Sequence, residues 1–146
     1  MAGDETSDMT SDVTSSVGRR PNTDERELWQ RAAAVAAHAH APYSRFAVGA
    51  ALRGPGAHVH VGVNVENASY PAGMCAERVA LGAFVTAGER DLRVMAVAAA
   101  DGRDALPCGL CLQALSEFGN PDVIAQVGGE LRVLRLHDLL AAPFTL

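Results

Sequence analysis

The sequence predicts an α/β domain with three layers, αβα, built around a five-stranded mixed sheet. The first observation is that helical and strand-like segments alternate along the chain, which favours crossover connections and a sheet with helices on both faces. The second is that only Gly128 and Gly129 separate the last two strand-like segments. Two glycines make a tight C-terminal hairpin whose strands are antiparallel, because a parallel crossover needs about ten or more residues.

The first half of the chain is expected to form one helix and two strands. Residues 24–40 carry an apolar stripe at helical spacing, with Thr23 as a candidate N-cap. The proline of "APYS" ends this helix, because proline restricts the residue before it. Strands are expected at residues 45–53 and 57–67, joined by the turn "GPG", and the second alternates valine with other residues.

The second half of the chain completes the sheet. Residues 75–88 show helical periodicity and end at a glycine, which is typical of a helix C-terminus. Residues 92–100 form a continuous apolar run, which indicates a strand covered on both faces. A short helix at 108–118 is stopped by "GNP", and strands at 122–127 and 130–139 follow, after which a final helical turn could close the chain.

Composition and charge exclude several classes of protein. The chain has 146 residues, of which 49% are hydrophobic and 20% charged, as in one soluble globular domain. Residues 1–22 are rich in Ser, Thr and Asp and predict a disordered tail, so the folded domain is expected at 23–146. The net charge of −5 argues against a nucleic-acid partner. No apolar run approaches the roughly 18 residues of a membrane span and no signal peptide is evident, so we expect a cytoplasmic protein with no membrane partner.

Three cysteines form the pattern that carries chemistry. Cys75 and Cys108 each stand where a predicted helix begins, and such helix starts share one edge of a crossover sheet, so the thiols can converge. Cys111 follows Cys108 by one helical turn, so both thiols project the same way. Three thiolates suit Zn²⁺ with an open fourth position, where the pKa of a water falls toward neutrality. Glu77 lies within reach of that position without being a ligand, and it is the candidate proton carrier.

Other interpretations stay open for each residue taken alone. A lone cysteine is more often a small buried apolar residue, a lone C-x-x-C can be a redox dithiol, and a histidine could complete a structural zinc site. The negative charge of a three-thiolate zinc site would be offset by two helix N-termini and by Arg78, which Gln113 could orient. His58 and His60 share one strand face, which we expect to be solvated or at an interface. The combination of "CAE" with "PCGLC" nevertheless favours one catalytic site.

The motifs "CAE" and "PCGLC" match the signature of zinc nucleobase deaminases that use three cysteines. With "PYSRFAVGAAL", "NVENASY", "PCGLCLQALSEF" and the ending "LLAAPF", the chain resembles the cytidine deaminase family of small homotetrameric enzymes over about residues 24–144. The resemblance implies the cytidine deaminase type of sheet and a hydrolase acting on a cyclic amidine C–N bond. It also implies one Zn²⁺ per subunit, bound by Cys75, Cys108 and Cys111.

The resemblance further implies roles for individual residues. Glu77 would take a proton from the water that attacks C4 of cytosine, protonate N3 and assist the departure of ammonia. The other substrate contacts would fall on the backbone at Ala76 and Pro107, on Phe46 against the pyrimidine, on Asn64 and Glu66 at the ribose hydroxyl, and on Tyr70 and Phe144, which would reach a neighbouring subunit's site. Without the family, Phe46 would be a core residue and the Asn64–Glu66 pair equally a turn cap. Leu112 departs from the family, which usually has arginine there.

The predicted function is the deamination of cytidine and deoxycytidine to uridine and deoxyuridine plus ammonia, as in pyrimidine salvage. Polynucleotide deaminases need a basic channel and nucleotide deaminases need cations for the phosphate, and neither is evident in this acidic chain. Intact "RFAVGA" and "NVENASY" favour a free nucleoside. The alternatives are a related substrate such as blasticidin S or a modified cytosine, and a non-catalytic zinc-stabilised scaffold. Glu77 argues against the scaffold, because a structural zinc site needs no proton carrier.

Overall fold

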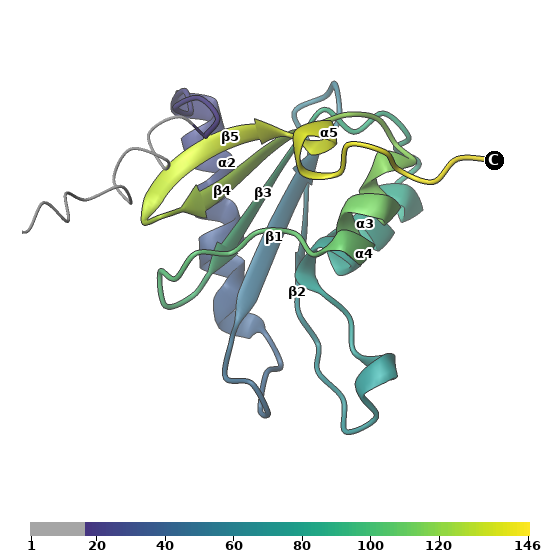
Figure 1. The fold of residues 1–146 in the computed structure, drawn as a ribbon. Coiled ribbons are helices and arrows are strands. Elements are labelled where there is room, and N and C mark those ends of the chain that lie inside the picture. The colour runs from purple at the N-terminus through teal and green to yellow at the C-terminus, as the bar shows by residue number, and fades with distance from the viewer. Residues whose placement is uncertain (1–16) are drawn as a thin grey trace, which may run out of the picture.

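The computed structural model describes residues 17–146 and contains one five-stranded sheet with helices on both faces (Figure 1). The elements in chain order are α2 (Thr23–Val35), β1 (Val48–Arg53), β2 (Val59–Val63), α3 (Ala76–Thr86), β3 (Val94–Ala99), α4 (Gly109–Ser116), β4 (Asp122–Val127), β5 (Glu130–Arg135) and α5 (Leu136–Leu139), with 3₁₀ turns at Ala36–His38 and Tyr70–Ala72. None of the helices in this part of the chain is long and apolar enough to cross a membrane.

The sheet is mixed, as predicted. Its strand order is β2-β1-β3-β4-β5, and β1 pairs antiparallel with both β2 and β3. The pair β3–β4 is parallel, because α4 forms the crossover between the two strands. The hairpin β4–β5 is antiparallel, and both of its turn glycines, Gly128 and Gly129, have positive φ angles, of 59° and 78°. Positive φ at both central residues is the requirement of a type I′ turn, so the predicted hairpin is confirmed.

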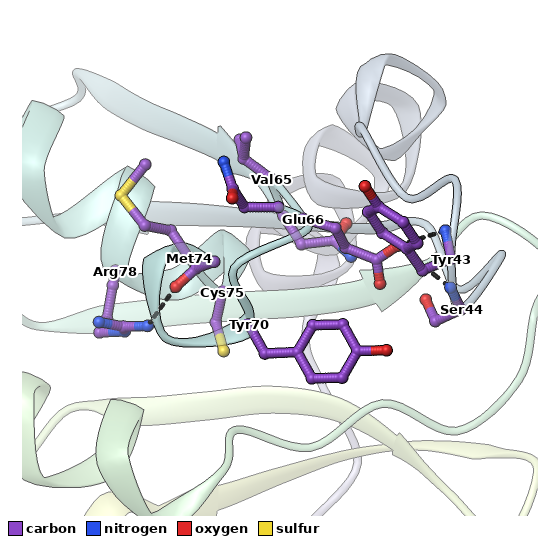
Figure 2. Close-up of a pocket in the computed structure, with 11 residues that line it drawn as sticks. Tyr43, Ser44, Val65, Glu66, Tyr70, Met74, Cys75 and Arg78 are labelled. Atoms are coloured by element: carbon purple, nitrogen blue, oxygen red, sulfur yellow. Dashed lines mark hydrogen bonds between the residues drawn. The ribbon is translucent and has the colours of Figure 1, made fainter.

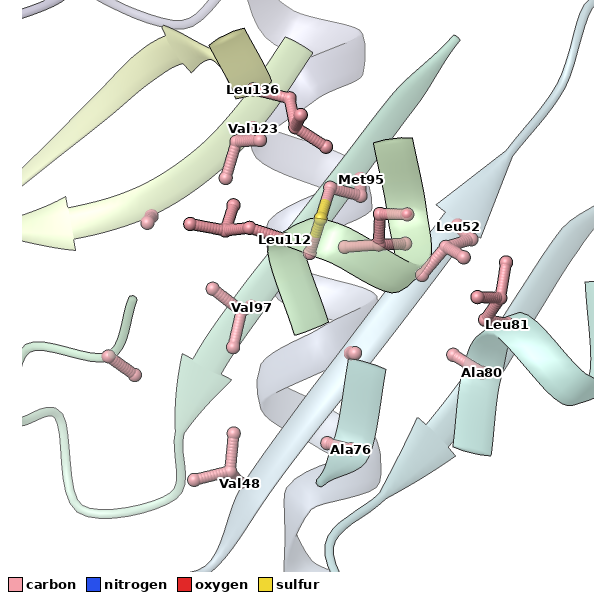
Figure 3. Close-up of a cluster of buried hydrophobic side chains, with 14 of the residues drawn as sticks. Val48, Leu52, Ala76, Ala80, Leu81, Met95, Val97, Leu112, Val123 and Leu136 are labelled. Carbon is pink, nitrogen blue, oxygen red and sulfur yellow. The ribbon is translucent and has the colours of Figure 1, made fainter. Parts of the chain in front are cut away.

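Each face of the sheet has its own apolar core. Helix α2 covers one face, where Leu28 and Ala32 pack against residues of β1, β3 and β4. Helices α3 and α4 cover the other face, where the larger cluster includes Leu52, Ala76, Ala80, Met95, Val97, Leu112, Val123 and Leu136 (Figure 3). This arrangement confirms the three-layer αβα prediction and places both cysteine-bearing helices on the same face.

The N-terminal side of α2 differs from the sequence prediction. The N-cap is Asn22 rather than Thr23, because Asn22 and Glu25 form a capping box in which each side chain accepts a hydrogen bond from the other's backbone N–H. The backbone of Arg19 pairs with Val133 of β5 in both directions, at 3.0 and 2.8 Å. The Arg19 guanidinium donates to the Glu25 carboxylate at 2.6 Å. Residues 17–22 are therefore attached to the sheet edge, whereas residues 1–16 of the predicted tail lie outside the described residues.

Strand β2 and helix α3 approach each other closely at Gly62. A methyl carbon on this glycine would lie 2.3 Å from the backbone nitrogen of Ala80 and 2.6 Å from the carbonyl oxygen of Ala76. The same face of β2 carries His60, which is buried and packs edge-on against Phe84 at 5.4 Å between ring centroids. The expectation of a solvated or interface histidine face is thus wrong for His60, because helix α3 covers this face of the strand.

The single tryptophan lies on the opposite face of the sheet. Trp29 of α2 is half-buried against the cluster beneath this helix, and its indole N–H donates to the carbonyl of Val97 at 3.1 Å. This bond ties α2 to the central part of β3. The indole is therefore separated by the sheet from the helices that carry the cysteines.

Candidate active site

The site begins at the first residues of two neighbouring helices. Cys75 is the N-cap of α3 and Cys108 is the N-cap of α4, and both have extended backbone conformations. Neither thiol makes a capping hydrogen bond to its own helix, so within the described chain both sulfurs are free to act as ligands. The backbone N–H groups of the two helix starts face the thiols and favour their negative charge.

The three cysteine sulfurs converge as the sequence predicts. The Sγ atoms of Cys75, Cys108 and Cys111 all lie within 4.8 Å of one another, and the Cys75 and Cys108 sulfurs are 4.0 Å apart. Three thiolates bound at about 2.3 Å to a tetrahedral zinc ion would lie about 3.8 Å from each other. The donor set and its spacing therefore fit Zn²⁺. Cys111 is buried, Cys75 half-buried and Cys108 exposed, which leaves one side of the cluster accessible.

The protonation of the thiols depends on their surroundings. Burial, together with the nearby Glu77 carboxylate, raises the pKa of Cys75 and of Cys111 above the ordinary thiol value. Burial also acts on Cys108, but the nearby backbone N–H groups at the start of α4 and the Cys111 and Cys75 thiols outweigh it and lower its pKa. Three adjacent thiols cannot all ionise without a compensating cation, which a divalent metal would supply.

Glu77 is the buried acidic residue of this cluster. It lies in the first turn of α3 and its side chain is only 4% exposed. Burial raises the pKa of its carboxyl above the ordinary value, and the Cys111 thiol and Arg78 offset part of that effect. A raised pKa makes a carboxyl a better proton acceptor while it can still return the proton, and general acid–base catalysis requires both.

A pocket of about 610 Å³ opens beside Cys75 (Figure 2). A volume of this size is typical of small-molecule sites. Its lining comes from the loop before β1, the end of β2, the following loop and the start of α3: Tyr43, Ser44, Asn64, Val65, Glu66, Asn67, Tyr70, Gly73, Met74, Cys75 and Arg78. The predicted contacts Asn64, Glu66 and Tyr70 thus share one pocket with Cys75, a predicted metal ligand.

The remaining predicted contacts do not line this pocket within a single chain: Phe46, Ala76, Pro107 and Phe144. Ala76 and Pro107 nevertheless lie beside the cluster, each adjacent in sequence to a cysteine that begins a helix. Phe144 is exposed on the C-terminal segment. The substrate contacts expected at these four residues therefore stay predictions.

Asn64 and Glu66 hold the loop that carries Phe46. The side-chain oxygen Oδ1 of Asn64 accepts from the Val48 N–H at 2.8 Å, and its side-chain nitrogen Nδ2 donates to the Phe46 carbonyl at 2.8 Å. One Glu66 carboxylate oxygen accepts from the backbone N–H groups of Tyr43 and Ser44, at 2.9 and 3.1 Å. Hydrogen bonds from Ser44 hold the pKa of Glu66 below its ordinary value, so this carboxylate is ionised. The turn-holding role is therefore present, and the ribose contact stays a prediction.

The loop between β3 and α4 adds a residue that sequence reasoning missed. The guanidinium of Arg103 lies over the Phe46 ring, 4.5 Å from its centroid, and is also paired with Asp101 at 2.6 Å. Such a cation–π contact fixes one face of the ring. No spacing in the sequence indicates it, because Arg103 and Phe46 meet only through the pairing of β1 with β3.

The two predicted supporting residues behave differently. Arg78 lines the pocket beside Cys75, donates to the Gly73 carbonyl at 3.3 Å, and keeps its Nε buried with no partner among the described residues. Gln113 does not orient Arg78: its amide makes both of its hydrogen bonds with the backbone of Phe144. The sequence suggested the wrong partner, because a contact between α4 and the C-terminal segment leaves no local pattern. Leu112, at the position where arginine is usual, is buried in the core and packs beneath α4.

Comparisons with known proteins identify the family of the chain. A family model described as the cytidine and deoxycytidylate deaminase zinc-binding region matches residues 22–127. A cytidine deaminase of Halalkalibacterium halodurans is 41% identical over 110 residues, covering 73% of this chain and 83% of that protein. A cytidine deaminase of Mycobacterium tuberculosis is 40% identical over 128 residues, covering 86% of this chain and 93% of that protein.

Solved structures give the same result for the fold. The crystal structure of a cytidine deaminase from Burkholderia pseudomallei matches with a TM-score of 0.75 at 40% identity, covering 82% of this chain and 98% of that chain. The crystal structure of a cytidine deaminase from Mycobacterium tuberculosis matches with a TM-score of 0.75 at 37% identity, covering 86% of this chain and 100% of that chain. The five-stranded mixed sheet and its helices are thus those of known cytidine deaminases.

Proposed function

The chain belongs to the cytidine and deoxycytidylate deaminase family, and we propose that it catalyses the hydrolytic deamination of cytidine and deoxycytidine to uridine and deoxyuridine plus ammonia. The observation that carries the proposal is the cluster of three cysteine sulfurs at two helix starts with the buried Glu77 carboxyl beside it. A structural zinc site needs the ligands but has no use for a buried acid. The combination supports an enzyme rather than a zinc-stabilised scaffold.

Cys75, Cys108 and Cys111 would hold the zinc ion. When bound, zinc supplies Lewis-acid chemistry that brings the pKa of a water near neutrality. Glu77 would accept a proton from the attacking water as its oxygen bonds to C4, and would deliver that proton to N3 of the cytosine ring. It would then take the remaining proton of the new C4 hydroxyl group and pass it to the amino group, so that the C4–N bond breaks and ammonia leaves. Its burial favours the protonated form, which suits the delivery steps, and excludes bulk water from the transfer. The backbone N–H groups at the helix starts offset the negative charge of the thiolates.

The pocket beside Cys75 is proposed to bind the nucleoside. Phe46 packs against the pyrimidine, the backbone at Ala76 and Pro107 contacts the base, and Asn64 with Glu66 contacts the ribose hydroxyl. The ionised Glu66 in the pocket lining suits a hydroxyl donor and repels a phosphate. This charge supports a free nucleoside over a nucleotide as the substrate, and the net charge of −5 disfavours nucleic acid.

The protein is proposed to act in the cytoplasm as a homotetramer whose active sites are shared between subunits. Tyr70 at the pocket rim is 79% exposed, and Phe144 on the C-terminal segment is also exposed. Their exposure leaves both aromatic side chains available for contact with another subunit. We expect Tyr70 and Phe144 to enter a neighbouring subunit's site, so an isolated subunit would be incomplete.

The test is the loss of the cytosine chromophore by ultraviolet absorbance. The purified, zinc-loaded protein is mixed in parallel with cytidine, deoxycytidine, cytosine, deoxycytidylate and blasticidin S. Turnover of the two nucleosides alone is the expected result. Turnover of blasticidin S alone would show that blasticidin S, and not cytidine, is the substrate. No turnover of any compound by a zinc-containing tetramer would favour the non-catalytic scaffold.

The variant Glu77→Gln tests the proton carrier directly. The amide keeps the size of the carboxyl but cannot carry the proton, so turnover should fall by about 10²–10⁴-fold or more. Zinc content and nucleoside binding should be unchanged, as measured by metal analysis and calorimetry. Retained turnover in this variant would remove Glu77 from the mechanism.

A further inference from the structure

The side chain of Gln113 pairs with the C-terminal segment at two points. Its carbonyl oxygen accepts from the Phe144 N–H at 2.8 Å, and its amide donates to the Phe144 carbonyl at 3.0 Å. One side-chain amide thus satisfies both polar backbone groups of one residue, as a neighbouring strand would. The pairing fixes the position and the direction of the backbone at Phe144.

Gln113 belongs to α4, the helix that carries the proposed metal ligands Cys108 and Cys111 at its start. It follows the ligand Cys111 by two residues in α4, and its neighbours Leu112 and Leu115 are buried in the core. A helix that is packed on one face and carries metal ligands at its start is a rigid support. The same helix that positions Cys108 and Cys111 therefore also fixes the position of Phe144.

The C-terminal segment has a second anchor upstream. Leu136 at the start of α5 is fully buried, and the His137 N–H donates to the Asn120 side chain at 3.0 Å. The chain between α5 and Phe144 is thus held at both ends. The two anchors leave the Phe144 backbone little freedom.

The Phe144 ring stays largely exposed although its backbone is held in place. The residue is 72% exposed although its backbone is fixed. Leu110, one helical turn before Gln113 on the same side of α4, is 59% exposed. An ordered backbone that holds an apolar ring in solvent indicates a ring presented to something outside the chain.

We propose that Gln113 is a positioning residue that fixes Phe144 for the active site of a neighbouring subunit. The inference rests on the proposed function, in which Phe144 enters that site. It adds that the metal-bearing helix α4 of one subunit sets the place of an aromatic ring in the substrate pocket of the next. Gln113 therefore acts on substrate binding in the neighbour and not on the metal of its own subunit.

The experiment compares four zinc-loaded, full-length proteins: wild type, Gln113→Ala, Phe144→Ala and the double variant. Gln30→Ala is the matched control, because Gln30 is an exposed glutamine of α2 on the other side of the sheet. The measurements are KM and kcat for cytidine, zinc per subunit, oligomeric state, and hydrogen exchange of the C-terminal peptide.

Gln113→Ala is expected to raise KM about tenfold, the size that follows from losing two partly exposed hydrogen bonds. Its kcat should stay within about threefold of wild type, with zinc content unchanged. The double variant should match Phe144→Ala, because Gln113 acts only through that ring. Exchange at the C-terminal peptide should speed up, while the peptide of α3 should be unaffected. Gln113→Glu keeps the acceptor for the Phe144 N–H but not the donor, and its KM should fall between wild type and Gln113→Ala.

Three results would overturn the proposal. The first is a double variant whose effects multiply, because Gln113 would then act independently of Phe144. The second is a Gln113→Ala protein with lost zinc or lowered kcat at unchanged KM, which would assign Gln113 to its own metal site. The third is unchanged exchange at the C-terminal peptide. If the wild type turns over no nucleoside, the proposed function fails. Hydrogen exchange then still tests whether Gln113 holds Phe144. Faster exchange of the C-terminal peptide in Gln113→Ala would support that attachment, and unchanged exchange would contradict it.

Discussion

The close approach of α3 to β2 at Gly62 makes a strong prediction about the active site. In Gly62→Ala, the added methyl carbon would lie 2.3 Å from the Ala80 nitrogen and 2.6 Å from the Ala76 carbonyl oxygen. Ordinary contacts between such atoms begin at about 3.4 Å. Both neighbours are backbone atoms, so relief requires the start of α3 to move from the sheet by about 1 Å. Ala76 stands between Cys75 and Glu77, so this movement would displace the proposed zinc ligand and the proposed proton carrier together.

The expected cost has two parts. Overpacking at this contact should lower the free energy of unfolding by about 1–3 kcal/mol. A displacement of about 1 Å at a catalytic group typically lowers turnover by about 100-fold, and ligand positions must hold to about 0.2 Å for tight metal binding. We therefore expect Gly62→Ala to lose turnover by about 100-fold and to bind zinc more weakly than wild type.

The assay combines denaturant unfolding, zinc affinity by chelator competition, and cytidine turnover. Gly82→Ala is the matched control, because Gly82 lies on the exposed side of the same helix with no atom within 4 Å of the added methyl group. This control should be slightly more stable than wild type, by about 0.5–1 kcal/mol, since alanine favours a helix. Wild-type zinc affinity and turnover in Gly62→Ala would refute the reasoning, as would equal losses in Gly82→Ala.

Three further predictions concern the metal, the core and the N-terminal attachment. Cys111→Ser should lose most of the bound zinc and with it the turnover, measured as zinc per subunit; full zinc occupancy would exclude Cys111 as a ligand. Phe84→Ala should lower the free energy of unfolding by about 3–5 kcal/mol in a denaturant titration, because this fully buried ring leaves a cavity. Arg19 holds the pKa of Glu25 below its ordinary value of 4.5. A lowered carboxyl pKa stabilises the fold above the unfolded value and the gain is lost as pH falls. The stability difference between wild type and Arg19→Ala should therefore be present at neutral pH, begin to shrink as pH falls through about 4.5, and disappear only below the lowered pKa of Glu25 in the folded protein. Any loss of metal in acid affects both proteins and cancels in this comparison. A difference that persists once Glu25 is protonated would contradict the ion pair.

The sequence predicted the order of the elements and the convergence of the cysteines because both follow from local rules. Helical and strand periodicities identify the elements, and the two glycines before β5 admit only a hairpin. Cys75 and Cys108 meet because each begins a helix on the same face of the sheet. The role of Glu77 could then be predicted from its place in the motif "CAE" without any distance.

Apart from the local Asn22–Glu25 capping box, the contacts that sequence reasoning missed join segments distant in the chain. Arg103 reaches Phe46 through strand pairing, Gln113 reaches Phe144 through the path of the C-terminal segment, and Arg19 pairs with the free edge of β5. His60 is buried because α3 packs on its face of β2. None of these contacts has a spacing of two, three or four residues that a pattern could detect.

The position of Trp29 gives the protein an internal optical probe. It is the only tryptophan in the chain, it lies half-buried on the side of α2 that faces the sheet, and its indole N–H donates to the carbonyl of Val97. Its fluorescence therefore reports the packing of α2 against the sheet, on the face opposite the cysteines. Removal of the metal should leave the emission maximum in place as long as the sheet is intact, whereas global unfolding should shift it to the red. Emission and metal content together can thus separate a protein that has lost its ion from one that has lost its fold.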